Sequence, residues 1–467
     1  MLFNSLPFAV FLVTICLLLR ALPPRGRPSL LLIASLLFYA LWIPVYLMLL
    51  LFEIAVNYAL LRGMLRSPRP RLWLTTSIVF SLGLLAVFKY AAFAITTAAP
   101  LLAQAFGTAP AVPEILLPLG ISFYTFQMLG LAIDSYRRDF APAPGLARYT
   151  LFIAFFPHFI AGPILRGRDL LPQLEHGIVF DPGKTHRGIW LLACGLAKKT
   201  IFADFLLAPF VNDVFAFPGV STAPVHLVAA WAFAFQIYFD FSGYTDMARG
   251  IALLVGLELP FNFKEPYLSR NPAEFWRRWH ITLSSWLRDY LYVPLGGNRR
   301  GLARTYTNLM LTMLLGGLWH GAGWSFLMWG GMHGVLLVGH RAFTRRTTPT
   351  DAALRWRDLP KILLLFNATC LLWVFFRAAT FADAWLFLHR LFTGNYASPW
   401  PVLPLATVLL CAVLHPLERI ARERLPVLQR ALGGSWGGLV EGLALGAILA
   451  LALAVSGSGG EFIYFQF

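Results

Sequence analysis

Two histidines are the residues of this sequence best placed to do chemistry, and the first is His320. It lies in a stretch, Thr305–His340, that carries no Asp, Glu, Lys or Arg. An ionisable side chain in so apolar a stretch is costly in lipid, so a functional role is its default interpretation. An imidazole has an unperturbed pKa of about 6.5, which suits a general base near neutral pH. The alternative is a histidine that packs between helices and bonds a backbone carbonyl.

The second histidine, His280, lies in the most polar region of the chain, Phe261–Gly301. This region is too charged to face lipid, yet six apolar residues recur in it at roughly helical spacing. They are Trp276, Trp279, Ile281, Leu283, Trp286 and Leu287. The pattern predicts either an amphipathic helix on the cytoplasmic leaflet or a segment that dips into the membrane under the cover of other helices. His280 in its middle favours the second.

The stretch around His320 holds a third histidine and several glycines. His333 follows by thirteen residues, which places it on another face of a continuous helix, so a supporting or packing role is expected. Gly317 and Gly321 have the spacing typical of closely packed helices. The same small residues leave room for a substrate passage. The residues expected to flank or wall it are Gly316, Gly317, Gly321, Gly323, Trp319 and Trp324.

Acyl transfer to a hydroxyl needs only a base for the hydroxyl proton and donors that hold the developing oxyanion. The signatures of other enzyme classes are missing from the sequence: a P-loop, a dinucleotide fingerprint, HExxH, CxxC and a nucleophile elbow. The four cysteines are isolated in apolar runs, without metal or redox spacing. The sequence therefore predicts no metal and no tightly bound cofactor.

A second polar cluster occupies Trp231–Gly250 and contains Asp240 and Asp246. Six residues apart, they do not share a face of an unbroken helix, and Gly243 could break it. Acidic groups at membrane depth are either functional or paired with basic residues. Ion pairs with the basic residues of Phe261–Gly301 are the favoured interpretation.

The composition indicates the class of protein in which these residues lie. Hydrophobic residues make up 58% and charged residues 13%, with a mean hydropathy of +0.67. A soluble domain would carry about a quarter charged residues. Apolar runs predict an all-α polytopic membrane protein with about ten to thirteen membrane helices, including re-entrant segments. The candidate spans are Leu6–Leu19, Ser29–Leu61, Leu72–Ala99, Ile115–Ile133, Tyr149–Ile164, Ile189–Phe210, Val225–Leu259, Tyr306–Val338, Ile362–Phe376, Val402–Leu414 and Leu439–Val455.

The net charge of +16 needs no nucleic-acid partner, because the basic residues lie in short loops between apolar runs. If the loops at Arg20–Arg27 and Arg62–Arg71 both face the cytoplasm, Ser29–Leu61 must leave the membrane and return, and Pro44 is a suitable break. The N-terminus is then external, and the first apolar run is predicted to be a retained helix rather than a signal peptide. One integral-membrane domain is expected over residues 1–467, with a catalytic core near 115–345 and C-terminal helices near 358–467.

The segments NPAEFWRRWHITLSSWLRDYLYVPLGGNR and GGLWHGAGWSFLMWGGMHG carry a family resemblance. With LLIASLLFYALW, LPLGISFYTFQMLGLAIDSYR, FFPHFIAGPI, YFDFSGYTDMARG and FIYFQF, they resemble the membrane-bound O-acyltransferase (MBOAT) family, in its bacterial alginate O-acetyltransferase branch. The resemblance implies that His320 matches the catalytic histidine. It also implies that His280 matches a second position, which is His in this branch and often Asn in eukaryotic members. A ring of helices around a funnel, with the acyl donor arriving from the cytoplasm, is implied as well.

The resemblance implies an enzyme of the bacterial inner membrane that moves acetyl groups toward hydroxyls of an exported, alginate-like polysaccharide. Acetyl-CoA or another acetyl donor is the expected substrate, and no cofactor is tightly bound. Membrane lipids, a periplasmic SGNH-type partner and the polysaccharide machinery are the expected partners. The residues expected to contact substrate or donor are Arg277, Arg278, Arg288, Asp289, Trp319, Trp324 and Trp276, with His333 in support. Two alternatives stay open: D-alanyl or other acyl transfer to a cell-envelope polymer, and a proton-coupled transporter, which the lack of inverted repeats disfavours.

Overall fold

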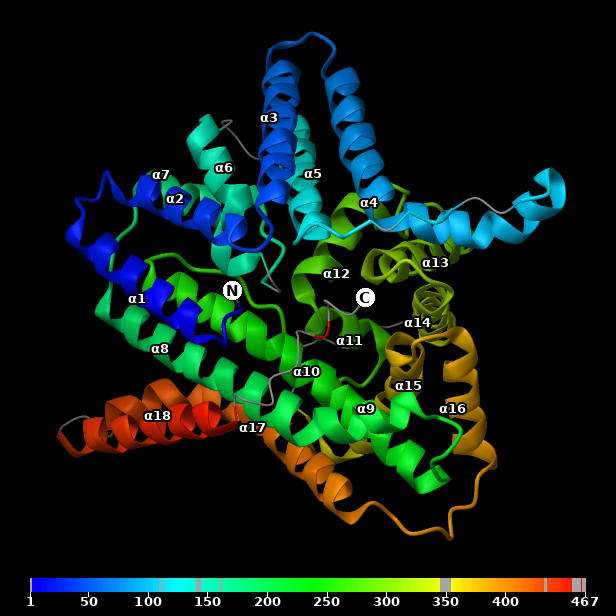
Figure 1. The fold of residues 1–467 in the computed structure, drawn as a ribbon. Coiled ribbons are helices and arrows are strands. Elements are labelled where there is room, and N and C mark those ends of the chain that lie inside the picture. The colour runs from blue at the N-terminus through cyan, green and yellow to red at the C-terminus, as the bar shows by residue number, and fades with distance from the viewer. Residues whose placement is uncertain are drawn as a thin grey trace. The chain divides into compact units, whose positions relative to one another are not determined.

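The computed structural model describes residues 2–108, 111–113, 115–139, 144–159, 162–344, 354–431, 435–455 and 463. Over these residues the regular structure is helical and no strand occurs, so the predicted all-α class is confirmed (Figure 1). Apart from Ile463, the FIYFQF segment lies outside the described residues.

Six helices of the described chain are long and apolar enough to cross a membrane. They lie in α3 (Pro44–Arg66), α4 (Pro70–Phe106), α10 (Ala223–Leu254), α15 (Leu359–Arg377) with the turn before it, α17 (Val402–Ala431) and α18 (Ser435–Val455). The predicted multi-pass membrane protein is thus confirmed, while the number of ten to thirteen membrane segments stays a prediction. The predicted break before Pro44 is present, because α2 ends at Ala40 and the proline opens α3, where its missing N–H costs nothing.

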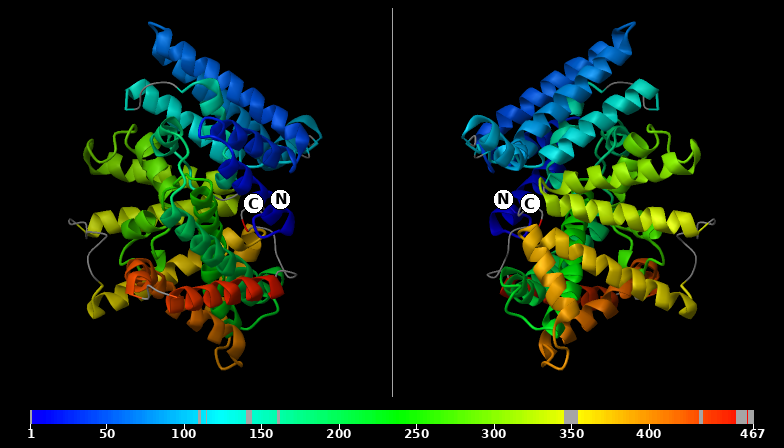
Figure 2. Two further views of the ribbon diagram at one scale, coloured as in Figure 1. Left: turned by 90° about the vertical axis from the view of Figure 1, so that its left-hand side faces the viewer. Right: turned by 90° about the vertical axis from the view of Figure 1, so that its right-hand side faces the viewer.

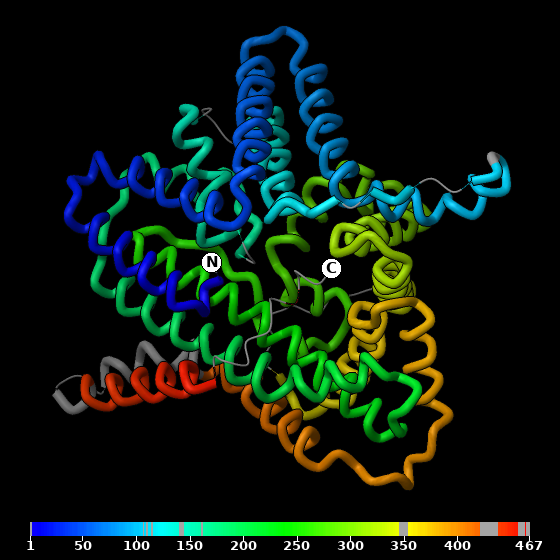
Figure 3. The backbone as a smooth tube through the Cα atoms, in the orientation of Figure 1, coloured from blue at the N-terminus to red at the C-terminus, as the bar shows by residue number. Residues whose placement is uncertain are grey.

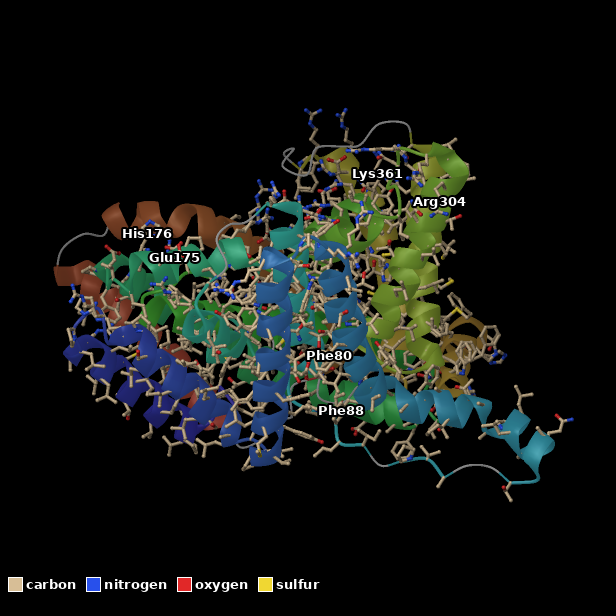
Figure 4. All side chains as sticks on the ribbon, turned by 90° about the horizontal axis from the view of Figure 1, so that it is seen from above. Phe80, Phe88, Glu175, His176, Arg304 and Lys361 are labelled. Carbon is tan, nitrogen blue, oxygen red and sulfur yellow. The ribbon has the colours of Figure 1, made fainter. Side chains whose placement is uncertain are left out.

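The described chain divides into two compact units, and the first comprises Met1–Ile189 and Ala248–Pro260. Its helices are α1 (Leu6–Ala21), α2 (Arg27–Ala40), α3, α4, α5 (Ile121–Arg137), α6 (Leu146–Ala154), η1 (Phe156–His158), α7 (Gly167–His176) and the first half of α8 (Pro182–Ala197). α3 and α4 form an antiparallel hairpin (Figure 1). Phe80 and Phe88 of α4, labelled in Figure 4, pack against Phe52 and Tyr46 of α3 at centroid distances of 5.9 and 6.3 Å.

The second unit comprises Trp190–Met247 and Phe261–Phe467. It holds the π-helix η2 (Lys198–Leu207), which continues the path of α8 into α9 (Ala208–Ala216) (Figure 3), and most of α10. It also holds η3 (Pro266–Leu268), α11 (Pro272–Arg278), α12 (Ile281–Leu287), the π-turn η4 (Arg288–Tyr292), α13 (Gly301–His320), α14 (Trp324–Phe343), η5 (Trp356–Asp358), α15, α16 (Phe381–Thr393), α17 and α18. The expected single domain over the whole chain stays a prediction.

α13 and α14 form a tight antiparallel pair (Figure 2). Their backbones meet at Gly317 and Gly330, where a Cβ on Gly330 would lie 2.3 Å from the Met313 carbonyl oxygen. A Cβ on Gly321 would lie 2.1 Å from the Phe326 ring. Small residues are therefore required here for close helix packing. With 20 residues, α13 is about 30 Å long, the thickness of the hydrocarbon core.

Candidate active site

His320 is the last residue of α13, and only 4% of its surface is exposed. Three aromatic rings surround its imidazole: Trp319, Trp329 and Phe376 lie 5.0, 5.1 and 5.4 Å away between centroids. All three meet the imidazole close to edge-on, at interplanar angles of 83°, 86° and 71°. The helix ends here because the next residue, Gly321, is extended. The structure thus places the predicted base inside an aromatic box.

His280 lies between α11 and α12 and is completely buried. Its ring meets Phe241 at 4.7 Å, Trp319 at 5.9 Å and His320 at 6.3 Å between centroids. The two predicted histidines are therefore brought together from separate helices. Their separation is too long for a direct hydrogen bond between the rings, but one hydroxyl group between them could contact both.

Asn262 fixes the tautomer of His280. Its Oδ1 accepts hydrogen bonds from the backbone N–H and the hydroxyl of Thr282, at 3.1 and 2.9 Å. The same oxygen lies 3.2 Å from Nδ1 of His280. A carbonyl oxygen only accepts, so Nδ1 must carry the ring proton. The lone pair of the neutral imidazole is then on Nε2, which can accept a hydrogen bond or a proton but cannot donate.

The surroundings of His280 keep it neutral. The residue lies outside the six candidate spans, and burial lowers its pKa to about 3. Its backbone is left-handed, with φ 42° and ψ 55°, a conformation that costs a non-glycine residue about 1–3 kcal/mol. A hydrogen bond of 2.9 Å from Ile281 N to the Asn262 carbonyl helps to hold this turn. Asn is one of the few other residues that tolerate such a backbone.

His333 lies closer to the site than the sequence indicated. The expected placement on another helical face assumed one continuous helix, but the chain turns between His320 and Trp324 and α14 folds back along α13. His333 is buried, and its ring lies 4.9 Å from Trp329 and 5.0 Å from Trp276. Trp329 therefore contacts both His320 and His333.

The residues predicted to bind substrate or donor are scattered. Trp319 is buried against both site histidines, whereas Trp324 is 58% exposed. Arg277 is exposed on α11. Arg288 and Asp289 bond each other at 2.6 Å on the surface of η4. The structure thus brings one of these five residues into the aromatic box.

Of the two other predicted ligands, Trp276 packs against Trp329 and His333, and Arg278 belongs to a buried clamp. Glu274 accepts hydrogen bonds from Nε and Nη2 of Arg270, both at 3.0 Å, and from Nη2 of Arg278 at 2.9 Å. Burial alone would raise the pKa of Glu274, but the hydrogen bonds from Arg270 and the charge of Arg278 hold it below its usual range. Arg278 also donates to the Lys264 carbonyl at 3.2 Å. The clamp fixes α11, which leads into His280.

Asp240 of α10 forms an ion pair, as expected, but the predicted partner was wrong. It is held by Lys199 of η2 at 2.7 Å, not by the basic residues of Phe261–Gly301. Lys199 also lies 2.7 Å from Asp204, and all three side chains are buried. The second oxygen of Asp240 accepts from the backbone N–H of Ile463 at 2.8 Å.

Lys198 forms the second half of this ionic network, 2.8 Å from Asp246 and 2.6 Å from Glu418. The predicted break of the helix at Gly243 was wrong, because α10 is continuous. Gly243 instead permits close approach: a Cβ there would lie 2.8 Å from the Gly195 carbonyl oxygen. Adjacent lysines thus pair with acidic residues that lie on different faces of α10.

Asn262, Trp329 and Phe376 were missed by the sequence reasoning. Asn262 offered a weak signal, a lone amide between two phenylalanines, but the other two are ordinary aromatic residues of apolar helices. Adjacent cations in an apolar run were the signal for Lys198 and Lys199. Among the described residues, no group of three or more His, Cys, Asp or Glu side chains is arranged to hold a metal ion.

Comparisons with known proteins show which family the sequence resembles. Residues 131–382 match the sequence profile of the membrane-bound O-acyltransferase family. A probable alginate O-acetylase, AlgI, of Azotobacter vinelandii is 41% identical over 400 residues, covering 84% of this chain and 78% of the relative. A peptidoglycan O-acetyltransferase of Helicobacter pylori is 37% identical and covers 76% and 71%. A teichoic acid D-alanyltransferase of Streptococcus thermophilus is 30% identical and covers 49% and 58%.

Proposed function

The chain belongs to the membrane-bound O-acyltransferase family, and we propose that it moves acetyl groups toward the hydroxyls of an exported polysaccharide. The observation that carries this proposal is the pair of buried histidines in one aromatic box, both within the residues that match the family. The alginate O-acetylases and the peptidoglycan O-acetyltransferase among its relatives support acetyl as the group and a polysaccharide as the acceptor.

His320 is the proposed general base. An acceptor hydroxyl seated between the rings gives its proton to His320 while its oxygen attacks the carbonyl carbon of the acyl donor. When the tetrahedral intermediate collapses, the bond to the leaving group breaks and His320 returns the proton to that group. A positioned base of this kind contributes about 10²–10⁴-fold to the rate.

His280 is the proposed positioning partner. Because Asn262 fixes the proton on Nδ1, the Nε2 lone pair can accept a hydrogen bond from the hydroxyl before His320 takes its proton. A neutral His280 cannot polarise the acyl carbonyl by donating from Nε2, so we assign it hydroxyl positioning and proton shuttling.

Acetyl-CoA is the proposed donor, reaching the box from the cytoplasmic side. Arg277, Lys264, Arg299 and Arg300 are exposed and would meet its phosphates. Arg304 in the first turn of α13, labelled in Figure 4, extends this basic group. The placement of the protein in a bacterial inner membrane, and of an SGNH-type partner and the polysaccharide machinery on the far side, belongs to the same proposal.

D-alanyl transfer to a cell-envelope polymer is the second candidate. It is favoured by the teichoic acid D-alanyltransferases of Streptococcus thermophilus and Bacillus subtilis, which are 30% and 27% identical to this chain. They match about half of the chain, whereas the acetylase of Azotobacter vinelandii and the O-acetyltransferase of Helicobacter pylori match three quarters or more of it. The proposal therefore favours acetyl transfer.

The direct test uses membrane vesicles that carry the protein, radiolabelled acetyl-CoA and an oligosaccharide acceptor. Label should become covalently attached to acceptor or partner with the wild-type chain, and not with His320→Gln, which fills similar space but is no base. A parallel reaction with a D-alanyl thioester separates the second candidate. Label that crosses the membrane chemically unchanged would instead indicate a transporter and overturn the proposal.

A further inference from the structure

The acyl carbonyl in this site needs a hydrogen-bond donor that His280 cannot supply. During attack, the carbonyl oxygen becomes an oxyanion, which a preorganised donor stabilises in a water-poor site. The His280 Nδ1–H is directed to Asn262, and its Nε2 carries the lone pair. A donor must therefore come from another wall of the box.

An aromatic cluster that adjoins the His320 box is rich in buried donors. Four indole N–H groups of this cluster have no hydrogen-bond acceptor among the described residues. They belong to Trp276, Trp279, Trp329 and Trp373. Buried polar groups are nearly always bonded, so such a cluster needs an explanation. An indole N–H only donates, so the cluster suits a ligand rich in acceptors, such as a carbonyl that becomes an oxyanion.

We propose that the indole N–H of Trp329 is the donor that binds the acyl carbonyl and stabilises its oxyanion, an inference that rests on the proposed acyl transfer. Of these four tryptophans, Trp329 is the one whose ring packs against the His320 imidazole, at 5.1 Å and 86°. Trp319 packs against the same imidazole from α13, at 5.0 Å. It is completely buried. The base and the donor therefore flank the same space, as attack on a carbonyl requires.

The role of Trp329 follows from the electron flow of the reaction. The hydroxyl oxygen forms a bond to the carbonyl carbon, and the C=O electron pair moves onto the carbonyl oxygen. Trp329 Nε1–H donates to that oxygen while His320 holds the hydroxyl proton. The electron pair then returns, the bond to the thiol leaving group breaks, and the thiolate takes the proton from His320. The atoms and electrons of this step balance without an oxidant, a reductant or a metal.

Leaving the donor unbonded before substrate binds favours catalysis. A buried N–H without an acceptor is destabilising, and this cost is relieved only when an acceptor arrives. Since the bond strengthens as negative charge develops, it stabilises the transition state more than the bound substrate. Removal of one such donor lowers kcat by about 10²–10³-fold in acyl-transfer enzymes.

Trp373 provides a matched control within the same cluster. It is also completely buried, its N–H also lacks an acceptor among the described residues, and its ring stacks on Trp329 at 5.5 Å and 25°. If these N–H groups only meet neighbouring aromatic faces, loss of either should have the same small effect. If Trp329 is the oxyanion donor, the two tryptophans should differ strongly.

The experiment compares Trp329→Phe and Trp373→Phe in the vesicle assay, using acetyl-CoA at varied concentration. Trp329→Phe should lower kcat by about 10²–10³-fold with KM nearly unchanged, whereas Trp373→Phe should stay within a few-fold of wild type. A second variant carries 3-benzothienylalanine at position 329, which keeps the shape of the indole and replaces its N–H by sulfur. It should reproduce the kcat defect at wild-type thermal stability, with the pH profile unchanged because the indole does not titrate.

Two outcomes would overturn the inference and leave the proposed function intact. One is wild-type kcat with benzothienylalanine at position 329, which would reduce Trp329 to a packing residue. The other is an equal loss in both phenylalanine variants. If the wild-type chain itself transfers no acetyl or other acyl group, the proposed function fails instead, so the two failures are distinguishable.

Discussion

The second unit contains two clusters of polar side chains in its apolar interior, and the clusters differ in how their polar atoms are paired. The ionic network of Lys198, Lys199, Asp204, Asp240, Asp246 and Glu418 carries full charges, and each lysine holds two carboxylates. The aromatic box around His320, with His280 beside it, is built from aromatic rings and contains a buried indole N–H, that of Trp329, without an acceptor among the described residues.

The difference indicates what each cluster is for. Buried charges are costly unless paired, and the short lysine contacts fix η2 against α10. Some carboxylate oxygens of the network, such as Asp204 Oδ2 and Glu418 Oε1, have no partner among the described residues. These atoms are hydrogen-bond acceptors. In the box, the indole N–H of Trp329 is a donor without an acceptor, and it lies beside His320. A donor next to a base suits a reaction that generates an oxyanion, whereas paired charges suit a fixed frame.

The largest expected effect is a loss of acetyl-transfer activity on substitution in the box, without a loss of stability. His320→Gln should lower acetyl transfer per folded molecule by at least about 10²–10⁴-fold, because the base is lost while the box is filled. The amount of folded protein, measured by size-exclusion chromatography in detergent, should match wild type. Substantial transfer by this variant would return His320 to a packing role.

The next effect should be in stability rather than in rate. Lys199→Met leaves Asp204 and Asp240 buried without their cation, and breaking such a pair typically costs about 3–5 kcal/mol. The yield and Tm in detergent should fall sharply, while any remaining folded protein keeps its kcat. The triple variant Lys199→Met, Asp204→Asn, Asp240→Asn should recover part of the loss. A normal Tm with lost kcat would instead place the network in the chemistry.

Asn262 tests whether the tautomer of His280 matters. Asn262→Ala removes the acceptor that fixes the proton on Nδ1, and misplacing a reacting group by about 1 Å can cost about 100-fold in rate. Thr282→Val is the matched control, because it removes a 2.9 Å bond to the same Oδ1 without touching His280. The Asn262 variant should lose kcat and the control should stay within a few-fold. Equal losses would mean that Oδ1 only holds the turn.

The sequence predicted the elements better than their contacts. Apolar runs located the helices, and Pro44 correctly separated α2 from α3, because both follow from local chemistry. The turn that brings α14 back along α13 was missed, since a run without charges does not reveal where a helix ends. The same limit applied to the site. His280 and His320 could be identified from the sequence as costly polar groups, whereas the role proposed for Trp329 rests on its contacts in the folded structure.

The smallest expected effect is the pH dependence of stability that His280 contributes. Its pKa is about 3 in the folded protein, against about 6.5 for a free imidazole. Below pH 6.5 the unfolded chain binds a proton that the folded chain refuses, so stability falls as pH falls from 6.5 toward 3. At pH 5 the loss is about 2 kcal/mol, at 1.36 kcal/mol per pH unit.

The ionic network also titrates, so the contribution of His280 must be isolated by a variant. His280→Asn suits this purpose, because Asn tolerates the left-handed backbone and its Nδ2–H can donate to Asn262 in place of Nδ1. It does not titrate, so its Tm in detergent should fall less between pH 7 and pH 5 than that of wild type, while the network contributes equally to both. Equal falls would mean that His280 is protonated without cost in the folded state. The box would then hold a charge like the network, and the contrast between the two clusters would fail.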